Sequence, residues 1–216
     1  MGARLVVVEG LDGAGKNTLT TALVGELADR GVSVGRLAFP RYGTPLADLA
    51  ADALHGGQAG TAESPHAMAL LFALDRHAAL GELRGLLAGN EVVLLDRYVA
   101  SNAAYTAARL GPGREAEVLE WIGGLEFGRL GLPRPDLQLL LDTPAALAAE
   151  RAGTREAADA GRTRDRYERD AALQAATGEA YRRLAASDWN SPWCVLGVDP
   201  DVARLADLVV GPGTDG

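Results

Sequence analysis

The chain has 216 residues, of which 48% are apolar and 23% are charged, and these values are typical of a globular protein with a full core. Its length predicts a single domain. The net charge of −8 argues against a general nucleic-acid-binding protein, because such proteins present a basic surface to the phosphate backbone. The single cysteine excludes an internal disulfide and favours a reducing compartment. No apolar run is long enough to cross a bilayer, so we expect a cytoplasmic protein.

Short apolar runs alternate with stretches of helical spacing along the whole chain. In the first half, the expected elements are a strand at 5–8, a helix at 18–30, a strand at 32–39 and helices at 45–54 and 65–88. In the second half, they are a strand at 91–95, helices at 101–110 and 116–130, a strand at 137–141 and a helix opening at 142–144. A mobile loop at 153–164, a helix at 165–186, a strand at 193–198 and a glycine-rich tail follow.

Five apolar strands separated by helices predict a parallel sheet with helices on both faces, which is a three-layer α/β/α fold. In such sheets, ligands bind at the carboxyl ends of the strands. The residues that carry chemistry are therefore expected just after each strand.

A glycine-rich turn follows the first strand and precedes the first helix. Gly10, Gly15 and Lys16 match most of the phosphate-binding P-loop pattern, in which backbone N–H groups and a lysine hold phosphate oxygens. Lys16 is also the only lysine among the 21 basic residues. The pattern departs at Asn17, where Ser or Thr normally offers a hydroxyl to Mg²⁺. The predicted ATP-binding residues are Gly10, Gly13, Ala14, Gly15, Lys16, Asn17 and Thr18.

Polar and aromatic residues also follow the second and third strands. Phe39 and Tyr42 come after the second strand, and Asp96 and Arg97 come after the third. Asp96 stands where P-loop enzymes place a metal-binding carboxylate, although it could instead cap a helix or pair with Arg97. Arg97 is suited to bidentate phosphate binding. On the next helix, Ser101, Asn102 and Tyr105 are further candidates.

Two more patterns bear on ligand binding. Phe72 and Arg76 lie four residues apart on a predicted helix, so they share a face and could stack on a base and donate to its carbonyl. Phe72 alone favours a core position, as aromatic residues on helices usually do. The arginine-rich stretch at 151–169 follows the fourth strand and its helix. It could form a lid over a transferring phosphate or simply a solvated face.

Together, these segments resemble the thymidylate kinase (dTMP kinase) family of bacteria, and most of all its mycobacterial type. The matching segments are the P-loop with Asp12, Phe39–Tyr42, Phe72–Arg76, Asp96–Tyr105 and Asp165–Glu168, in order. The resemblance implies a P-loop kinase fold with a five-stranded parallel sheet and a lid at about residues 152–166. It also implies transfer of the γ-phosphate of ATP to dTMP with Mg²⁺.

The resemblance further implies roles for individual residues. The implied catalytic residues are Asp12, Lys16, Arg97, Arg155 and Glu168. The implied dTMP-binding residues are Asp12, Phe39, Tyr42, Phe72, Arg76, Arg97, Ser101, Asn102, Tyr105, Asp165 and Tyr167. The implied metal-binding residues are Asp12, Asp96 and Glu168. Phe72 would stack on thymine, Arg76 and Asn102 would bind its edge, and Tyr105 would favour deoxyribose.

The family is commonly a homodimer and commonly has a cis peptide bond at the position of Phe39–Pro40. We expect small-molecule substrates and no nucleic-acid polymer or membrane partner. A kinase for another nucleotide or for a deoxynucleoside is the nearest alternative. A GTPase switch needs an Asn-Lys-x-Asp segment, which a chain with one lysine at position 16 cannot contain. A non-catalytic scaffold would have no reason to keep Lys16 and Arg97.

Overall fold

The computed structural model describes residues 2–57, 60–158 and 165–211, and of residues 155–158 and 169 only the backbone. Its described strands form one parallel sheet in the order β2-β3-β1-β4-β5. They are β1 (Arg4–Glu9), β2 (Val34–Ala38), β3 (Val92–Asp96), β4 (Leu137–Leu141) and β5 (Trp193–Leu196). The predicted five-stranded parallel sheet is therefore confirmed.

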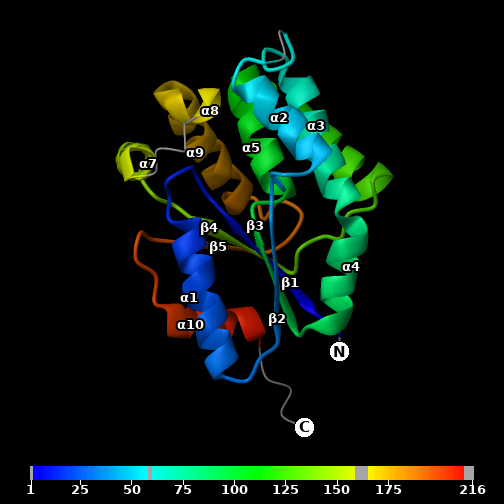
Figure 1. Ribbon diagram of the computed structural model, residues 1–216, viewed down its shortest axis with the longest axis vertical. Coiled ribbons are helices and arrows are strands. Elements are labelled where there is room, and N and C mark those ends of the chain that lie inside the picture. The colour runs from blue at the N-terminus through cyan, green and yellow to red at the C-terminus, as the bar shows by residue number, and fades with distance from the viewer. Residues whose placement is uncertain (1, 58–59, 159–164, 212–216) are drawn as a thin grey trace.

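The central strands are apolar on both faces because helices cover both. In β1, Leu5 to Val8 are at most 2% exposed. On one face lie α1 (Lys16–Asp29) and α10 (Val202–Val210), which pack on each other and on β1. On the other lie α4 (Leu80–Gly89) and α9 (Ala171–Ala186), as right-handed crossovers require (Figure 1). The expected three-layer α/β/α arrangement is confirmed.

The remaining helices gather near the carboxyl ends of the strands (Figure 1). They are α2 (Pro45–Leu54), α3 (Pro65–Ala78), α5 (Val99–Leu110), α6 (Glu115–Gly123), a π-helix η1 (Gly124–Arg129), α7 (Ala145–Ala158) and α8 (Arg166–Arg169). Among these, α5 packs closely along α9, while α2 lies against α3. Of these helices, α2, α3, α5 and α8 form walls of the site described below.

Five expectations about elements are wrong in part. The helix predicted at 165–186 is interrupted at Asp170, which separates α8 from α9. The helix predicted at 65–88 is broken at Ala79 into α3 and α4, and the helix at 116–130 ends as the π-helix η1. The loop predicted from 153 is helical to Ala158, since α7 continues through the alanine-rich stretch. The rest of the expected lid, residues 159–164, lies outside the described residues. The tail contains α10, whose apolar residues Leu205, Ala206 and Val209 pack into the core.

The structure also bears on the isomer of the Phe39–Pro40 bond and on the expectation that no segment crosses a membrane. The Phe39–Pro40 peptide bond is cis. Within the described ranges, no helix has the length and apolar character needed to cross a membrane.

The start of α10 yields a test of the fold. Asp201 accepts hydrogen bonds from the backbone N–H groups of Ala203 and Arg204 and so caps this helix. Asp201→Ala should destabilise the protein by about 1 kcal/mol and lower Tm by roughly 2–4 °C in a thermal melt. Asp199→Ala removes a nearby exposed carboxylate that caps no helix and should change stability by less than about 0.5 kcal/mol. Equal melting of the two variants would contradict the capping role.

Candidate active site

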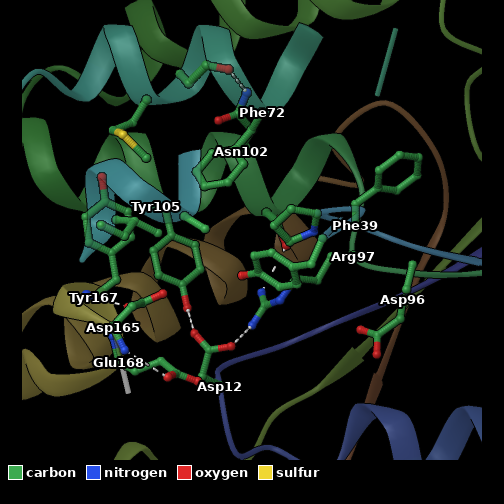
Figure 2. A pocket seen from close by; sticks show the side chains of 18 of the residues that line it. Asp12, Phe39, Phe72, Asp96, Arg97, Asn102, Tyr105, Asp165, Tyr167 and Glu168 are labelled. Atoms are coloured by element: carbon green, nitrogen blue, oxygen red, sulfur yellow. Dashed lines mark hydrogen bonds and ion pairs between the residues drawn. The ribbon is translucent and has the colours of Figure 1, made fainter. Parts of the chain in front are cut away.

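A cavity of about 900 Å³ opens at the carboxyl ends of β1, β2 and β3. Most of the predicted site residues lie around it, and Figure 2 shows ten of them. The predicted residues that line the cavity are Asp12, Gly13, Gly15, Lys16, Asn17, Phe39, Tyr42, Phe72, Arg76, Asp96, Arg97, Ser101, Asn102, Tyr105, Asp165, Tyr167 and Glu168. Segments far apart in sequence thus converge on one site, as the sheet topology predicts.

The P-loop backbone requires glycine at two positions. Gly13 has a φ of 85°, and a Cβ there would lie 1.9 Å from the carbonyl oxygen of Ala148 on α7. Gly15 has a φ of 106° and starts α1, so the N-terminal N–H groups of this helix face the cavity. Thr143, before α7, donates to the Ala14 carbonyl oxygen at 3.1 Å and holds the loop from behind.

Lys16 is buried in this loop, with only 7% of its surface exposed. Its ammonium donates to the carbonyl oxygens of Gly10 at 3.1 Å and Leu11 at 2.8 Å. Burial, together with the nearby positive charge of Arg97, lowers the pKa of Lys16 to about 8. The ammonium is therefore mostly charged at neutral pH, but its pKa lies only slightly above neutrality.

The carboxylate of Asp12 joins two other elements. Arg97 Nη2 donates to one of its oxygens at 2.5 Å, and Tyr105 Oη donates to the other at 2.7 Å (Figure 2). Burial alone would raise the pKa of Asp12, but the charges of Arg97 and Lys16 and the Tyr105 hydrogen bond bring it well below its usual value. Asp12 is thus a fixed anion that orients Arg97.

A second carboxylate, Glu9 at the end of β1, holds the turn that carries Arg97. Arg97 has a φ of 64°, which is uncommon for a residue with a side chain. The next residues are tied to Glu9: its Oε1 accepts from the N–H groups of Tyr98 and Ser101, and its Oε2 accepts from the hydroxyls of Ser101 and Tyr181. Arg97 Nη1 in turn donates to Ser101 Oγ at 3.1 Å and to Tyr181 Oη at 3.3 Å.

Phe72, Arg76 and Asn102 lie at another part of the cavity wall (Figure 2 labels Phe72 and Asn102). Arg76 donates through Nε and Nη2 to both carboxylate oxygens of Glu126, at 2.5 and 2.8 Å. Asn102 Nδ2 donates to the Ala69 carbonyl oxygen and to Glu126 Oε1. The sequence therefore grouped Arg76 with Asn102 correctly, but it gave no sign of the buried glutamate that joins them.

The first residues after the undescribed part of the lid form another wall. Asp165 caps α8 by accepting from the N–H groups of Tyr167 and Glu168. Burial, with the neighbouring charges of Asp12 and Glu168, raises the pKa of Asp165 to about 6. Tyr167 stacks on Tyr105 at a centroid distance of 5.9 Å.

Two side chains that the sequence analysis did not single out hold this stacked pair. Gln174 Nε2 donates to the hydroxyl of Tyr105 at 3.3 Å and to the backbone oxygen of Tyr167 at 3.0 Å. Arg109 donates to the Tyr167 hydroxyl and, at 2.5 Å, to the Ala62 carbonyl oxygen. The stacked rings are thus fixed from α5 and α9 together.

The loop after β2 is anchored by a buried acid on α3. Asp75, only 1% exposed, accepts from the backbone N–H and the Nε of Arg41. This contact turns Arg41 toward α3, while Phe39 and Tyr42 line the cavity.

The three predicted metal-binding carboxylates do not form one cluster. Among the described residues, no group of three or more His, Cys, Asp or Glu side chains is placed to hold one metal ion. Asp12 is bound to Arg97 and Tyr105, and Asp96 lies apart from Asp12 and Glu168 in Figure 2. Asp96 Oδ1 is buried with no hydrogen-bond partner in the described part of the chain. An unpaired buried carboxylate oxygen suits a hydrated Mg²⁺, so Asp96 fits that group best.

Among the described side chains, three predicted residues are not among those that line the cavity. Gly10 and Ala14 shape the P-loop from behind, and Thr18 is exposed on the first turn of α1. Arg155 belongs to α7, but its side chain lies outside the described residues.

Sequence reasoning missed Glu9 and Glu126, both completely buried. One signal was available for Glu9, because an acid at the end of an otherwise apolar strand must find partners when it is buried. Glu126 carried no comparable signal, since the stretch at 116–130 contains three glutamates at positions that look exposed on a helix.

Comparisons with known proteins agree on one family. The family model described as Thymidylate kinase matches residues 8–199. The chain is 52% identical over 209 residues to thymidylate kinases from two strains of Mycobacterium tuberculosis, covering 96% of this chain and 98% of theirs. It is 33% identical over 147 residues to the Homo sapiens thymidylate kinase, covering 68% of this chain and 64% of that one. The fold matches a thymidylate kinase structure from Candida albicans with a TM-score of 0.68 at 23% identity, over 95% of this chain and 88% of that one.

The lowered pKa of Lys16 predicts how ATP binding depends on pH. Because this pKa is about 8, raising the pH from 7 to 9 neutralises the ammonium and should weaken ATP binding by about tenfold. The measurement is the dissociation constant of ATP across this range. Lys16→Arg is the control, since its guanidinium stays charged and its affinity should not change with pH. An equal loss in Lys16→Arg would assign the titration to another group.

Proposed function

We propose how this cavity carries out its reaction, from the premise that the chain belongs to the thymidylate kinase family. The chain transfers the γ-phosphate of ATP to dTMP and yields ADP and dTDP. One arrangement supports our assignment of roles: the P-loop lies beside the Asp12–Arg97 pair, and an aromatic and amide wall follows within the same cavity. Such a cavity accommodates a donor triphosphate and an acceptor nucleotide together.

The donor end is the P-loop. The N–H groups at the start of α1 and the ammonium of Lys16 would hold the phosphates of ATP. Within the described residues, the partners of the Lys16 ammonium are loop carbonyl oxygens, so phosphate oxygens can replace them with little rearrangement of the loop.

At the acceptor end, Arg97 would bind the dTMP phosphate while Asp12 fixes its direction. Tyr105 would border the sugar, because its hydroxyl is held by Asp12 and its ring by Tyr167. Phe72 would stack on the base. These assignments follow the convergence of the side chains on one cavity.

Phosphoryl transfer needs alignment of donor and acceptor and compensation of spread negative charge more than covalent work by the protein. The acceptor phosphate is already a nucleophile, so we assign no general base. Mg²⁺, when bound with ATP, would neutralise phosphate charge. Asp96 would hold its hydration shell, and Glu168 and Asp12 border the same cavity. Arg155 stays a candidate for contact with the transferring group.

The homodimer, the cytoplasmic location and the single domain stay predictions. A sedimentation experiment on the whole chain would test the first of them.

The substrate is tested with a coupled assay of ADP release. Given equal concentrations of dTMP, dCMP, dGMP, dAMP and thymidine, the protein should turn over dTMP with the highest kcat/KM. A better rate with another nucleotide or with the nucleoside would contradict the assignment of the acceptor site.

Arg97 is tested by Arg97→Ala. The variant loses a buried charged contact to the acceptor phosphate, so kcat/KM for dTMP should fall. The fall should correspond to a loss of transition-state stabilisation of about 2–5 kcal/mol. Arg204→Ala serves as the control, because it removes an exposed arginine on α10 that is not among the residues lining the cavity. Kinetics like those of the unaltered protein would remove Arg97 from the site.

A further inference from the structure

We propose that Glu126 is a specificity-determining residue, which selects a base with a 4-oxo group and an N3–H by fixing the polarity of Arg76 and Asn102. The inference rests on the proposed placement of the base beside Phe72. It concerns a residue that lies behind the cavity wall and does not line it.

The first step concerns the amide of Asn102. Its Nδ2 lies 2.9 Å from the Ala69 carbonyl oxygen and 2.7 Å from Glu126 Oε1. Both partners are pure acceptors, so the NH₂ group must face them and both of its hydrogens are used. The oxygen Oδ1 is therefore the polar atom that Asn102 offers to the cavity, and it is an acceptor.

The second step concerns the guanidinium of Arg76, which is only 3% exposed. Its Nε and Nη2 each donate to one oxygen of Glu126, which is a bidentate pair. This pairing fixes the plane of the guanidinium and leaves only donors for the cavity, namely the two N–H groups of Nη1 and the second N–H of Nη2.

The third step joins the two. One wall presents a donor from Arg76 and an acceptor from Asn102. Thymine and uracil have an acceptor at O4 and a donor at N3, so both contacts are satisfied. Cytosine has a donor amino group at C4 and an acceptor at N3, so both contacts would be mismatched. A site built to hydrogen-bond a given edge rejects the wrong edge strongly, because its buried groups are left unpaired.

The fourth step explains why Glu126 controls this polarity. Its carboxylate is entirely buried and lies on the π-helix η1, a helix type that often occurs at functional sites. As a pure acceptor, it prevents the Asn102 amide from turning over. A glutamine at this position would carry an NH₂ group that faces Arg76 in either orientation of the amide, and in one orientation it would face Asn102 as well. Arg76 would therefore lose a partner in both cases, and with it the fixed plane of its guanidinium.

The test compares kcat/KM for dTMP, dUMP and dCMP in Glu126→Gln. The dTMP to dCMP ratio should fall about tenfold or more. The dTMP to dUMP ratio should stay within about twofold, since these bases share the same hydrogen-bonding edge. The KM for ATP should not change. Glu120→Gln, which makes the same substitution at an exposed position on α6, should leave both ratios unaltered.

Several outcomes would overturn the inference. A folded Glu126→Gln with an unchanged dTMP to dCMP ratio would do so, and so would an equal loss of activity with all three nucleotides, which indicates a structural role only. If the unaltered protein does not prefer dTMP over dCMP, the proposed function fails instead.

A second variant covers the case in which Glu126→Gln does not fold. Glu126→Asp keeps the negative charge but withdraws the carboxylate from both Arg76 and Asn102 by one methylene. It should lower the dTMP to dCMP ratio about threefold or more with the same dTMP to dUMP ratio. An unchanged ratio in a folded Glu126→Asp would then count against the role of Glu126.

Discussion

The carboxylate of Asp12 is the contact on which the geometry of the cavity depends, because it joins the P-loop to the turn after β3 and to α5. It binds Arg97 with one oxygen and Tyr105 with the other. Gln174 extends the chain of hydrogen bonds from Tyr105 to the start of α8. Without this anion, Arg97 would be a largely buried cation with hydroxyl partners only, which is a costly arrangement. The phosphate-binding direction of Arg97 is therefore set before any substrate arrives.

The same solution recurs at two other arginines in and beside the site. Arg76 is paired with Glu126, and Arg41 is paired with Asp75. Removing a guanidinium from water costs several kcal/mol, and a carboxylate that accepts two of its N–H groups offsets this cost while fixing its plane. The acids thus have a second effect, which is to restrict the remaining N–H groups to one direction. At the base end, this restriction is what makes a donor and an acceptor distinguishable to a ligand.

The parts of the structure that the sequence predicted are those with local causes. The strands were apolar runs, and the P-loop was a glycine spacing in which Gly13 has no room for a side chain. The missed parts depend on distant partners. Glu126 meets Arg76 fifty positions away. The break at Ala79 and the π-helix η1 lie inside continuous helical patterns, so packing and not propensity decides them. Asp12, Asp96 and Glu168 border one cavity without forming one cluster among the described residues, because arrival at one sheet edge does not fix which side chains meet.

The net charge of −8 also bears on how the site binds anionic substrates. Such a charge gives no long-range attraction for anionic substrates. Within the cavity, the positive charge of Arg97 is balanced by Asp12, and the buried Lys16 is close to losing its proton at slightly alkaline pH. Affinity for phosphate must then come from short-range hydrogen bonds in a fixed geometry and not from a strong field. A site of this kind binds a ligand well only when the donors and acceptors of the ligand match, so the paired acids that reduce attraction are also the source of selectivity.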